Sequence, residues 1–201
     1  MKPGEWRENL HSPLFAADIR ACGGIEWEQI AKWEELSMVE NVPFSNVTQM
    51  LRQKPQAMAQ VRGSSEYPSV HGFVDFYQMP DGVLVKARVA GLPVTPTGFF
   101  GFHIHSVGRC SGRAGDPFGD ASGHYNPGGN LHPRHAGDLP PLLADRGRAF
   151  QVFFTDRFSV YEILGKALII HLGPDDFTSQ PAGNAGARIA CGEIRPLARS
   201  V

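Results

Sequence analysis

The sequence predicts an all-β fold, a Greek-key β-sandwich or flattened barrel of about eight antiparallel strands with a short N-terminal helical extension. Three observations predict this fold. Short segments of β character recur after about residue 57, and two long irregular stretches interrupt them. Glycine and proline are also frequent, at 23 and 16 of 201 residues. Short strands separated by many turn residues are typical of sandwiches and barrels.

Residues 1–55 are expected to form an extension, partly helical or disordered, ahead of a domain that spans 56–201. All three tryptophans lie in this extension, and the segment 27–36 has roughly helical character. A second short helix is expected from Ser45, a good N-cap residue, to Arg52. The role of the extension is open at this stage: it could cover a sheet edge, mediate oligomerisation or be a tail.

The strands follow from alternation and from short apolar runs bounded by turn residues. The clearest is 83–90, in which the apolar residues at odd positions share one face while Lys86 and Arg88 lie on the other. We expect strands at 70–79, 83–90, 99–105, 150–154, 166–171 and 188–194. The stretches 106–145 and 172–187 are expected to be long loops, which inside compact domains are usually functional.

Composition limits the function classes. The net charge is −1, which gives no reason to expect nucleic acid or an anionic membrane as a partner. No run of about 18 apolar residues predicts a membrane span. The N-terminus lacks the apolar stretch of a secretory signal, so we expect a cytoplasmic protein. The three cysteines, Cys22, Cys110 and Cys191, allow at most one intrachain pair, and reduced thiols are the usual state in the cytoplasm.

Six of the eight histidines fall between His103 and His171. His103 and His105 end an expected strand, and residues two apart on a strand point to the same face, about 6–7 Å apart. Two imidazoles so placed can hold one metal ion. His171 ends a strongly apolar strand, where an unpaired polar ring needs a reason.

The expected loop 106–145 holds the other members of this constellation. His132, His135 and Asp138 lie within seven residues and supply two imidazoles and a carboxylate, a ligand set that suits zinc. His124 follows a glycine-rich stretch. A single loop histidine is usually a solvated surface residue, but six histidines and an aspartate around strand ends indicate a transition-metal site. Spacing alone does not name a reaction.

Four sequence blocks carry a resemblance to a known family. Residues 101–105 (GFHIH), 123–127 (GHYNP), 135–140 (HAGDLP) and 183–192 (GNAGARIACG) resemble signatures of the copper/zinc superoxide dismutases, and they occur in that family's order. The resemblance covers about residues 57–194. It implies a metalloenzyme that converts superoxide to oxygen and hydrogen peroxide by cycling between Cu(II) and Cu(I).

The resemblance also implies two metal sites. The implied copper ligands are His103, His105, His124 and His171, and four imidazole nitrogens suit Cu(II). The implied zinc ligands are His124, His132, His135 and Asp138. His124 would then bridge the two metals as an imidazolate and would supply a proton during the reaction.

Further roles follow from the same resemblance. Asp175 would accept hydrogen bonds from the outer nitrogens of His103 and His132 and so tie the two sites together. Arg188 would hold superoxide beside copper, and Cys110 and Cys191 would form a disulfide. Cys22 has no counterpart in the family and is expected to be a free thiol. Family members are monomers or dimers, so a homodimer is one expected assembly.

Two departures and two alternatives accompany this interpretation. The spacing between His132 and His135 is short for the family, and the segment 176–182 contains no lysine or glutamate, so we expect weaker electrostatic steering. One alternative is a copper-delivering module of the same fold, but such domains often lack a copper ligand or the arginine. The other is a structural β-sandwich that binds zinc only. Copper content and redox cycling separate the three.

Overall fold

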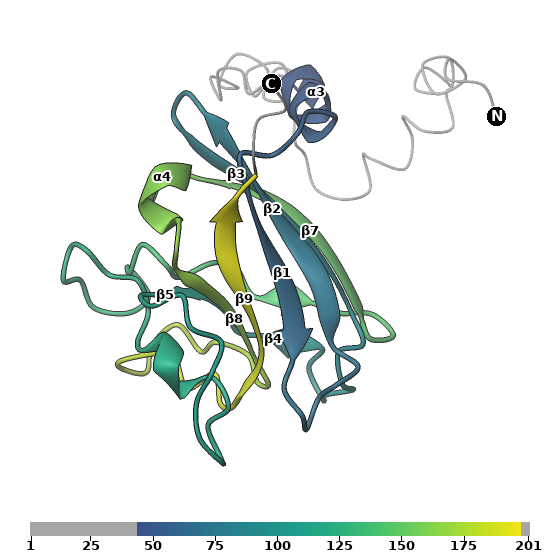
Figure 1. Cartoon of the computed structure of the whole chain (residues 1–201), viewed down its shortest axis with the longest axis vertical. Helices are drawn as coiled ribbons and strands as arrows, with labels where there is room; N and C mark the ends of the chain where they lie inside the picture. The colour runs from purple at the N-terminus through teal and green to yellow at the C-terminus, as the bar shows by residue number, and fades with distance from the viewer. Residues whose placement is uncertain (1–43, 198–201) are drawn as a thin grey trace, which may run out of the picture. The chain divides into compact units, whose positions relative to one another are not determined.

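The computed structural model describes residues 44–197 (Figure 1). The chain separates into two compact units, Met1–Asn46 and Val47–Val201, and the strands belong to the second. Helix α3, Phe44–Leu51, confirms the helix expected near Ser45. The helix expected at 27–36 lies outside the described residues, and the domain boundary at residue 55 stays a prediction. No helix in the described part is long and apolar enough to cross a membrane.

An antiparallel sheet of seven strands dominates the second unit, and its strand order is β5-β8-β9-β1-β2-β3-β7. A second sheet pairs β4 with β6. The strands are β1 Ala57–Gly63, β2 His71–Met79, β3 Gly82–Ala90, β4 Phe99–Phe100, β5 Phe102–His105, β6 Leu142–Leu143, β7 Arg148–Thr155, β8 Ala167–His171 and β9 Arg188–Pro196. The all-β prediction is confirmed. Figure 1 shows the large sheet strongly curled, with the last strand, β9, beside the first, β1.

The core lies on the inner face of the curled sheet and follows the predicted alternation. In β3 the four residues expected on one face are all buried: Val83, Val85, Ala87 and Val89. They join one continuous apolar cluster with side chains of β1, β2, β5, β8 and β9. Burial of that apolar surface is the main favourable contribution to folding.

The predicted strand 99–105 is wrong as one strand, because it divides at Gly101 into β4 and β5, which belong to different sheets. The Gly101 N–H donates to the carbonyl of Gly173 at 2.7 Å, outside the ladder of either strand. A Cβ on Gly101 would lie 2.7 Å from the Ala185 Cβ and 3.2 Å from the His171 Cβ. The chain therefore crosses between sheets at a residue that packs directly against the loop after β8.

Four elements of the described chain fall outside the predicted ranges. Strand β1 precedes the first predicted strand, the 3₁₀ helix η2 (Gly119–Ala121) and strand β6 lie in the long stretch 106–145, and helix α4, Val160–Ile163, follows β7. Ser159 is the N-cap residue of α4, and its N–H donates to the Glu162 carboxylate at 2.7 Å. The rest of the two long loops is irregular, and in Figure 1 both run on the side of the sheet where β5 and β8 lie.

We expect the substitution Gly101→Ala to lower the free energy of unfolding of the metal-free protein by about 1–3 kcal/mol, because overpacking displaces neighbouring backbone. Gly123→Ala is the matched control, since a Cβ at Gly123 meets no atom within 4 Å. Denaturant unfolding of both variants measures the difference. Equal stability of the two variants would contradict the close contact at Gly101.

Candidate metal centre

Strand β5 brings the ligands together through its backbone. One edge of β5 pairs with β8, and the other edge forms bridges in which His103 lies opposite Asp138 and His105 lies opposite His124. The Ile104 N–H donates to the Gly137 carbonyl at 2.8 Å, and the Ile104 carbonyl accepts from Tyr125 at 2.7 Å. Two loop segments thus pair with β5 through backbone hydrogen bonds, as neighbouring strands of a sheet do.

Gly137 is required for this pairing, because a Cβ at that position would clash with the carbonyl oxygen of Ile104. Only a residue without a side chain lets the loop approach the strand so closely. His171 arrives from the opposite side, at the end of β8, where the register shifts between Ile170 and His171. The His171 N–H donates to the Gly101 carbonyl at 2.8 Å.

The first metal group consists of four histidines whose candidate ligand atoms all lie within 4.8 Å of one another: His103, His105, His124 and His171. Three of these rings have one nitrogen engaged on the outer side. His103 Nε2 is 2.7 Å from the Asp175 carboxylate, His105 Nδ1 is 2.8 Å from the Ser122 carbonyl, and His171 Nδ1 is 3.1 Å from the Gly186 carbonyl.

The remaining nitrogens of this group face one another. His105 Nε2 and His171 Nε2 are 3.4 Å apart. His103 Nδ1 and His124 Nε2 are buried and have no hydrogen-bond partner. Buried polar atoms are almost always satisfied, so converging unsatisfied nitrogens indicate a site for a cation. Four neutral imidazoles are a donor set that copper accepts.

The second metal group shares one residue with the first. His124, His132, His135 and Asp138 also place their candidate ligand atoms within 4.8 Å of one another. His124 Nδ1 lies 2.7 Å from Asp138 Oδ1, and His132 Nδ1 lies 3.1 Å from Asp138 Oδ2. His132 Nδ1 is buried and lacks a hydrogen-bond partner. Three imidazoles and a carboxylate around one point are a donor set that suits zinc.

His124 belongs to both groups through different nitrogens. Its Nδ1 points into the second group and its Nε2 into the first, so a single ring separates the two positions. The ring centroid of His124 lies 4.0 Å from that of His103 and 5.5 Å from that of His135. The geometry therefore places a bridging imidazole where the sequence predicted one.

Burial sets the charge of the first group. Desolvation lowers the pKa of His105 to about 2 and that of His171 to about 3, and it lowers the pKa of His103 despite the nearby Asp175. These rings are therefore neutral at pH 7, which is the state that binds a metal. Although burial alone would raise the pKa of Asp175, hydrogen bonds from His103, the Phe177 N–H and His132 lower it to about 2. Burial also opposes ionisation of Asp138, yet His124 and other donors lower its pKa.

Asp175 connects the two groups, as predicted. One carboxylate oxygen is 2.7 Å from His103 Nε2, and the other is 2.9 Å from His132 Nε2. A histidine ring has two nitrogens, so engaging Nε2 fixes which nitrogen faces the metal group. Asp175 thereby turns the Nδ1 atoms of His103 and His132 inward.

Arg188 lies at the rim of the first group. Its Nη1 donates to the Phe118 carbonyl at 2.7 Å, and its Nη2 donates to the Ser122 carbonyl at 2.8 Å. The Ser122 carbonyl also accepts from His105 Nδ1, so one peptide oxygen contacts both the arginine and a metal-group ring. These partners were not predicted, because every residue has a backbone carbonyl and the residue types therefore do not show which carbonyl accepts.

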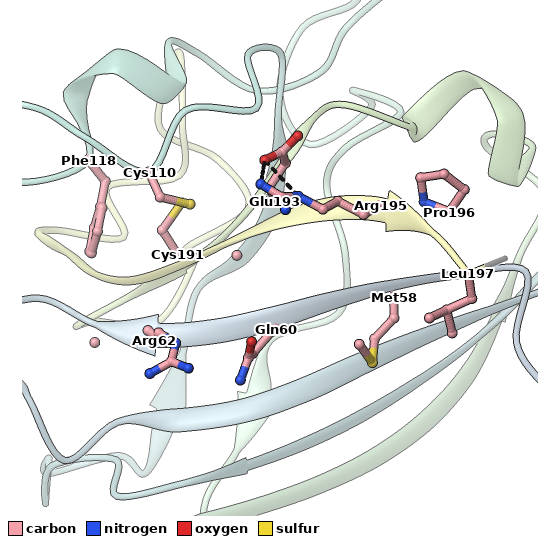
Figure 2. Close-up of a pocket in the computed structure, with 12 residues that line it drawn as sticks. Met58, Gln60, Arg62, Cys110, Phe118, Cys191, Glu193, Arg195, Pro196 and Leu197 are labelled. Carbon is pink, nitrogen blue, oxygen red and sulfur yellow. Dashed lines mark hydrogen bonds and ion pairs between the residues drawn. A yellow bond between two sulfur atoms is a disulfide. The ribbon is translucent and has the colours of Figure 1, made fainter.

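The structure confirms the predicted disulfide between Cys110 and Cys191, whose Cα atoms are 5.6 Å apart across a sequence separation of 81. The pair lines a groove over β1 and β9 with a volume of about 490 Å³. Figure 2 shows this groove with the two cysteines and the ion pair between Glu193 and Arg195. Cys191 lies three residues after Arg188 in β9. The bridge therefore ties the loop that contains Phe118 and Ser122 to the strand that carries the arginine.

The chain is similar to several known proteins. The family model "Copper/zinc superoxide dismutase (SODC)" matches residues 70–194. A Cu-Zn superoxide dismutase of Aquifex aeolicus is 41% identical over 141 residues, which cover 63% of this chain and 80% of that protein. The copper chaperone for superoxide dismutase of Sus scrofa is 29% identical over 205 residues, covering 88% of this chain and 72% of the chaperone. A crystal structure of a double mutant of a SOD-like protein from Bacillus subtilis matches with a TM-score of 0.59 and 32% identity, covering 67% of this chain and 94% of that one.

Removal of the disulfide by the substitution Cys110→Ser is expected to lower the free energy of unfolding by about 4–5 kcal/mol, the loop-closure value for a loop of this length. Cys22→Ser, which keeps both cysteines of the bridge, is the control. Denaturant unfolding of the two variants under non-reducing conditions provides the comparison. Disulfide bridges contribute between about 0 and 5 kcal/mol. A loss of less than about 1 kcal/mol in C110S would contradict the expected value and show that this bridge contributes little.

Proposed function

The chain belongs to the copper/zinc superoxide dismutase family, and from that membership we propose how its residues divide the work of converting superoxide to oxygen and hydrogen peroxide. One observation carries the assignment. Two complete ligand groups share His124, and Arg188 stands at the rim of the first. Copper, when bound, supplies the one-electron chemistry, and zinc is redox-silent.

We assign His103, His105, His124 and His171 to copper, and His124, His132, His135 and Asp138 to zinc. A copper-delivering module is the second candidate, because a copper chaperone is among the relatives. Such modules often lack a copper ligand or the arginine, whereas this chain retains all four histidines and Arg188. The dismutase assignment is therefore the stronger of the two.

Arg188 is proposed to bind superoxide. A guanidinium has five N–H donors and stays charged at every physiological pH. Two nitrogens of Arg188 each donate to a carbonyl, which fixes the plane of the group, and the remaining N–H bonds are available to an anion. The nearest carboxylate in the described chain, that of Asp116, is 4.0 Å from Nη1, so it competes only weakly for this charge.

His124 is proposed to hold and release a proton at Nε2. This atom is buried beside the first group and has no other hydrogen-bond partner in the described structure, so a proton on it has no competing acceptor. Nδ1 stays directed at the second group beside Asp138. The ring can therefore deliver a proton toward bound substrate without turning. The cytoplasmic location and a homodimer stay predictions.

The function is tested by superoxide decay, followed by pulse radiolysis or stopped flow on protein loaded with copper and zinc. Fast, chelator-resistant decay with about one copper and one zinc per chain is the result expected of a dismutase. Full metal occupancy without fast decay would overturn the assignment and favour the copper-delivering module.

The substitution His124→Ala is expected to lower zinc affinity by more than the roughly 10- to 100-fold typical of residues that only orient a ligand, and to lower the dismutation rate with it, because one ring serves both groups. His71→Ala is the control, since His71 is an exposed histidine on β2. Metal titration and superoxide decay are measured on both variants. Retention of zinc at wild-type affinity in H124A would contradict the bridging role.

The substitution Arg188→Ala is expected to lower the dismutation rate about 10- to 100-fold while both metals stay bound, since it removes a charge-assisted contact to the substrate. Arg62→Ala, at an exposed position on β1, is the control. Rate and metal content are determined on the same samples. Loss of copper in R188A would instead give Arg188 a role in building the site.

A further inference from the structure

The segment 132–138, here called the zinc loop, supplies three of the four ligands of the second metal group. Two residues outside both ligand groups, Arg157 and Gln180, hydrogen-bond to its backbone from different sides. We propose that Arg157 and Gln180 are positioning residues that hold the zinc loop in its ligand-presenting conformation before the metal binds. This inference rests on the proposed function, because that function assigns zinc to the second group.

Arg157 contacts the zinc loop at three points with one atom. Its Nη1 donates to the carbonyl of Pro133 at 3.1 Å, of His135 at 3.3 Å and of Asp138 at 3.1 Å. Three carbonyl oxygens directed at one point repel one another through their partial negative charges, and a cationic donor between them offsets that repulsion. The permanently charged guanidinium supplies this donor and so stabilises the tight curve of the loop.

The position of Arg157 is itself set by the large sheet. Arg157 lies two residues after the end of β7, and its backbone N–H donates to the hydroxyl of Thr155 at 3.3 Å. The next element, α4, is attached to β2, because the Val160 N–H donates to the side-chain carbonyl of Gln78 at 2.8 Å. The Gln78 amide in turn donates to the carbonyls of Met79 and Gly82. Arg157 therefore connects the zinc loop to the β2–β3–β7 part of the sheet.

Gln180 holds the zinc loop from the loop at 172–187. Its side-chain oxygen accepts from the His132 N–H at 3.1 Å, and its side-chain nitrogen donates to the His132 carbonyl at 2.7 Å. Asp175, in the same loop, holds the His132 ring through Nε2. Backbone and side chain of one ligand residue are thus fixed by two residues only five positions apart.

These contacts are confined to one metal group. The ligands unique to the copper group, His103, His105 and His171, lie on β5 and β8 and touch neither Arg157 nor Gln180 through any hydrogen bond of the described structure. Removal of the Arg157 contacts should therefore weaken zinc binding and leave copper binding nearly unchanged. A merely structural role would weaken both metals alike.

The deciding experiment uses full-length protein loaded with copper and zinc, with the substitution Arg157→Met. Methionine keeps much of the aliphatic stem and removes every donor. Release of zinc to a chelator is expected to be about tenfold faster than in wild type, in line with the effect of residues that orient metal ligands, with copper release unchanged. Arg148→Met, at an exposed arginine at the start of β7, is the matched control and should match wild type.

Three further measurements complete the test. Amides of the zinc loop should exchange hydrogen faster in metal-free R157M than in metal-free wild type, which reports the loop without any metal. Arg157→Lys keeps a charge and N–H donors and should restore part of the zinc retention, and Gln180→Ala should also release zinc faster than wild type. Any one of four outcomes would overturn the proposal. These are zinc release from R157M and Q180A at the wild-type rate, no restoration of zinc retention in R157K, equal loss of copper and zinc, and unchanged hydrogen exchange of the zinc-loop amides. The zinc measurement does not use superoxide, so failure of the dismutase assignment would be seen separately.

Discussion

Both oxygens of the buried Asp175 carboxylate bind imidazole nitrogens, and the metal centre depends on this arrangement. Oδ2 lies 2.7 Å from His103 Nε2, and Oδ1 lies 2.9 Å from His132 Nε2. His103 comes from a strand and His132 from a loop, so the carboxylate fixes two rings that the backbone does not bring into register. Because each ring has only two nitrogens, the same contacts decide which nitrogen faces each metal group. A protonated Asp175 could not accept both bonds, and its pKa of about 2 keeps it ionised at neutral pH.

Irregular backbone can hold ligands accurately here because regular backbone supports it. His124 and Asp138 lie in the long stretch that follows β5, yet both oppose β5 residues in backbone bridges. The disulfide fixes the other part of that stretch to β9, close to Arg188. Hydrogen bonds or a covalent bond therefore attach each of these loop segments to a strand. This attachment limits the loss of ligand geometry through loop motion.

The sequence was sufficient for most strands of the large sheet and for the residue types at the metal centre. Alternation identified the buried face of β3, and the blocks around His103, His124, Asp138 and Arg188 predicted what the structure brings together. The sequence was insufficient wherever a backbone atom acts. The division at Gly101 depends on contact with Ala185, and Arg188 donates to the carbonyls of Phe118 and Ser122; none of these contacts has a residue-specific pattern. Arg157 was missed for the same reason, since its guanidinium donates to backbone carbonyls.

The metal centre also lowers the stability of the metal-free fold, because His103 Nδ1, His124 Nε2 and His132 Nδ1 are buried without hydrogen bonds. Each unsatisfied buried polar atom costs about 1–3 kcal/mol, so the three together cost several kcal/mol. The Cys110–Cys191 bridge offsets a comparable amount, about 4–5 kcal/mol in the chain-entropy model, and does so without metal. A ligand that binds only the folded chain adds stability by mass action, so metal binding stabilises the fold further. The covalent bridge and the Asp175 hydrogen bonds thus let the chain hold an energetically unfavourable arrangement of nitrogens open for the metals that satisfy them.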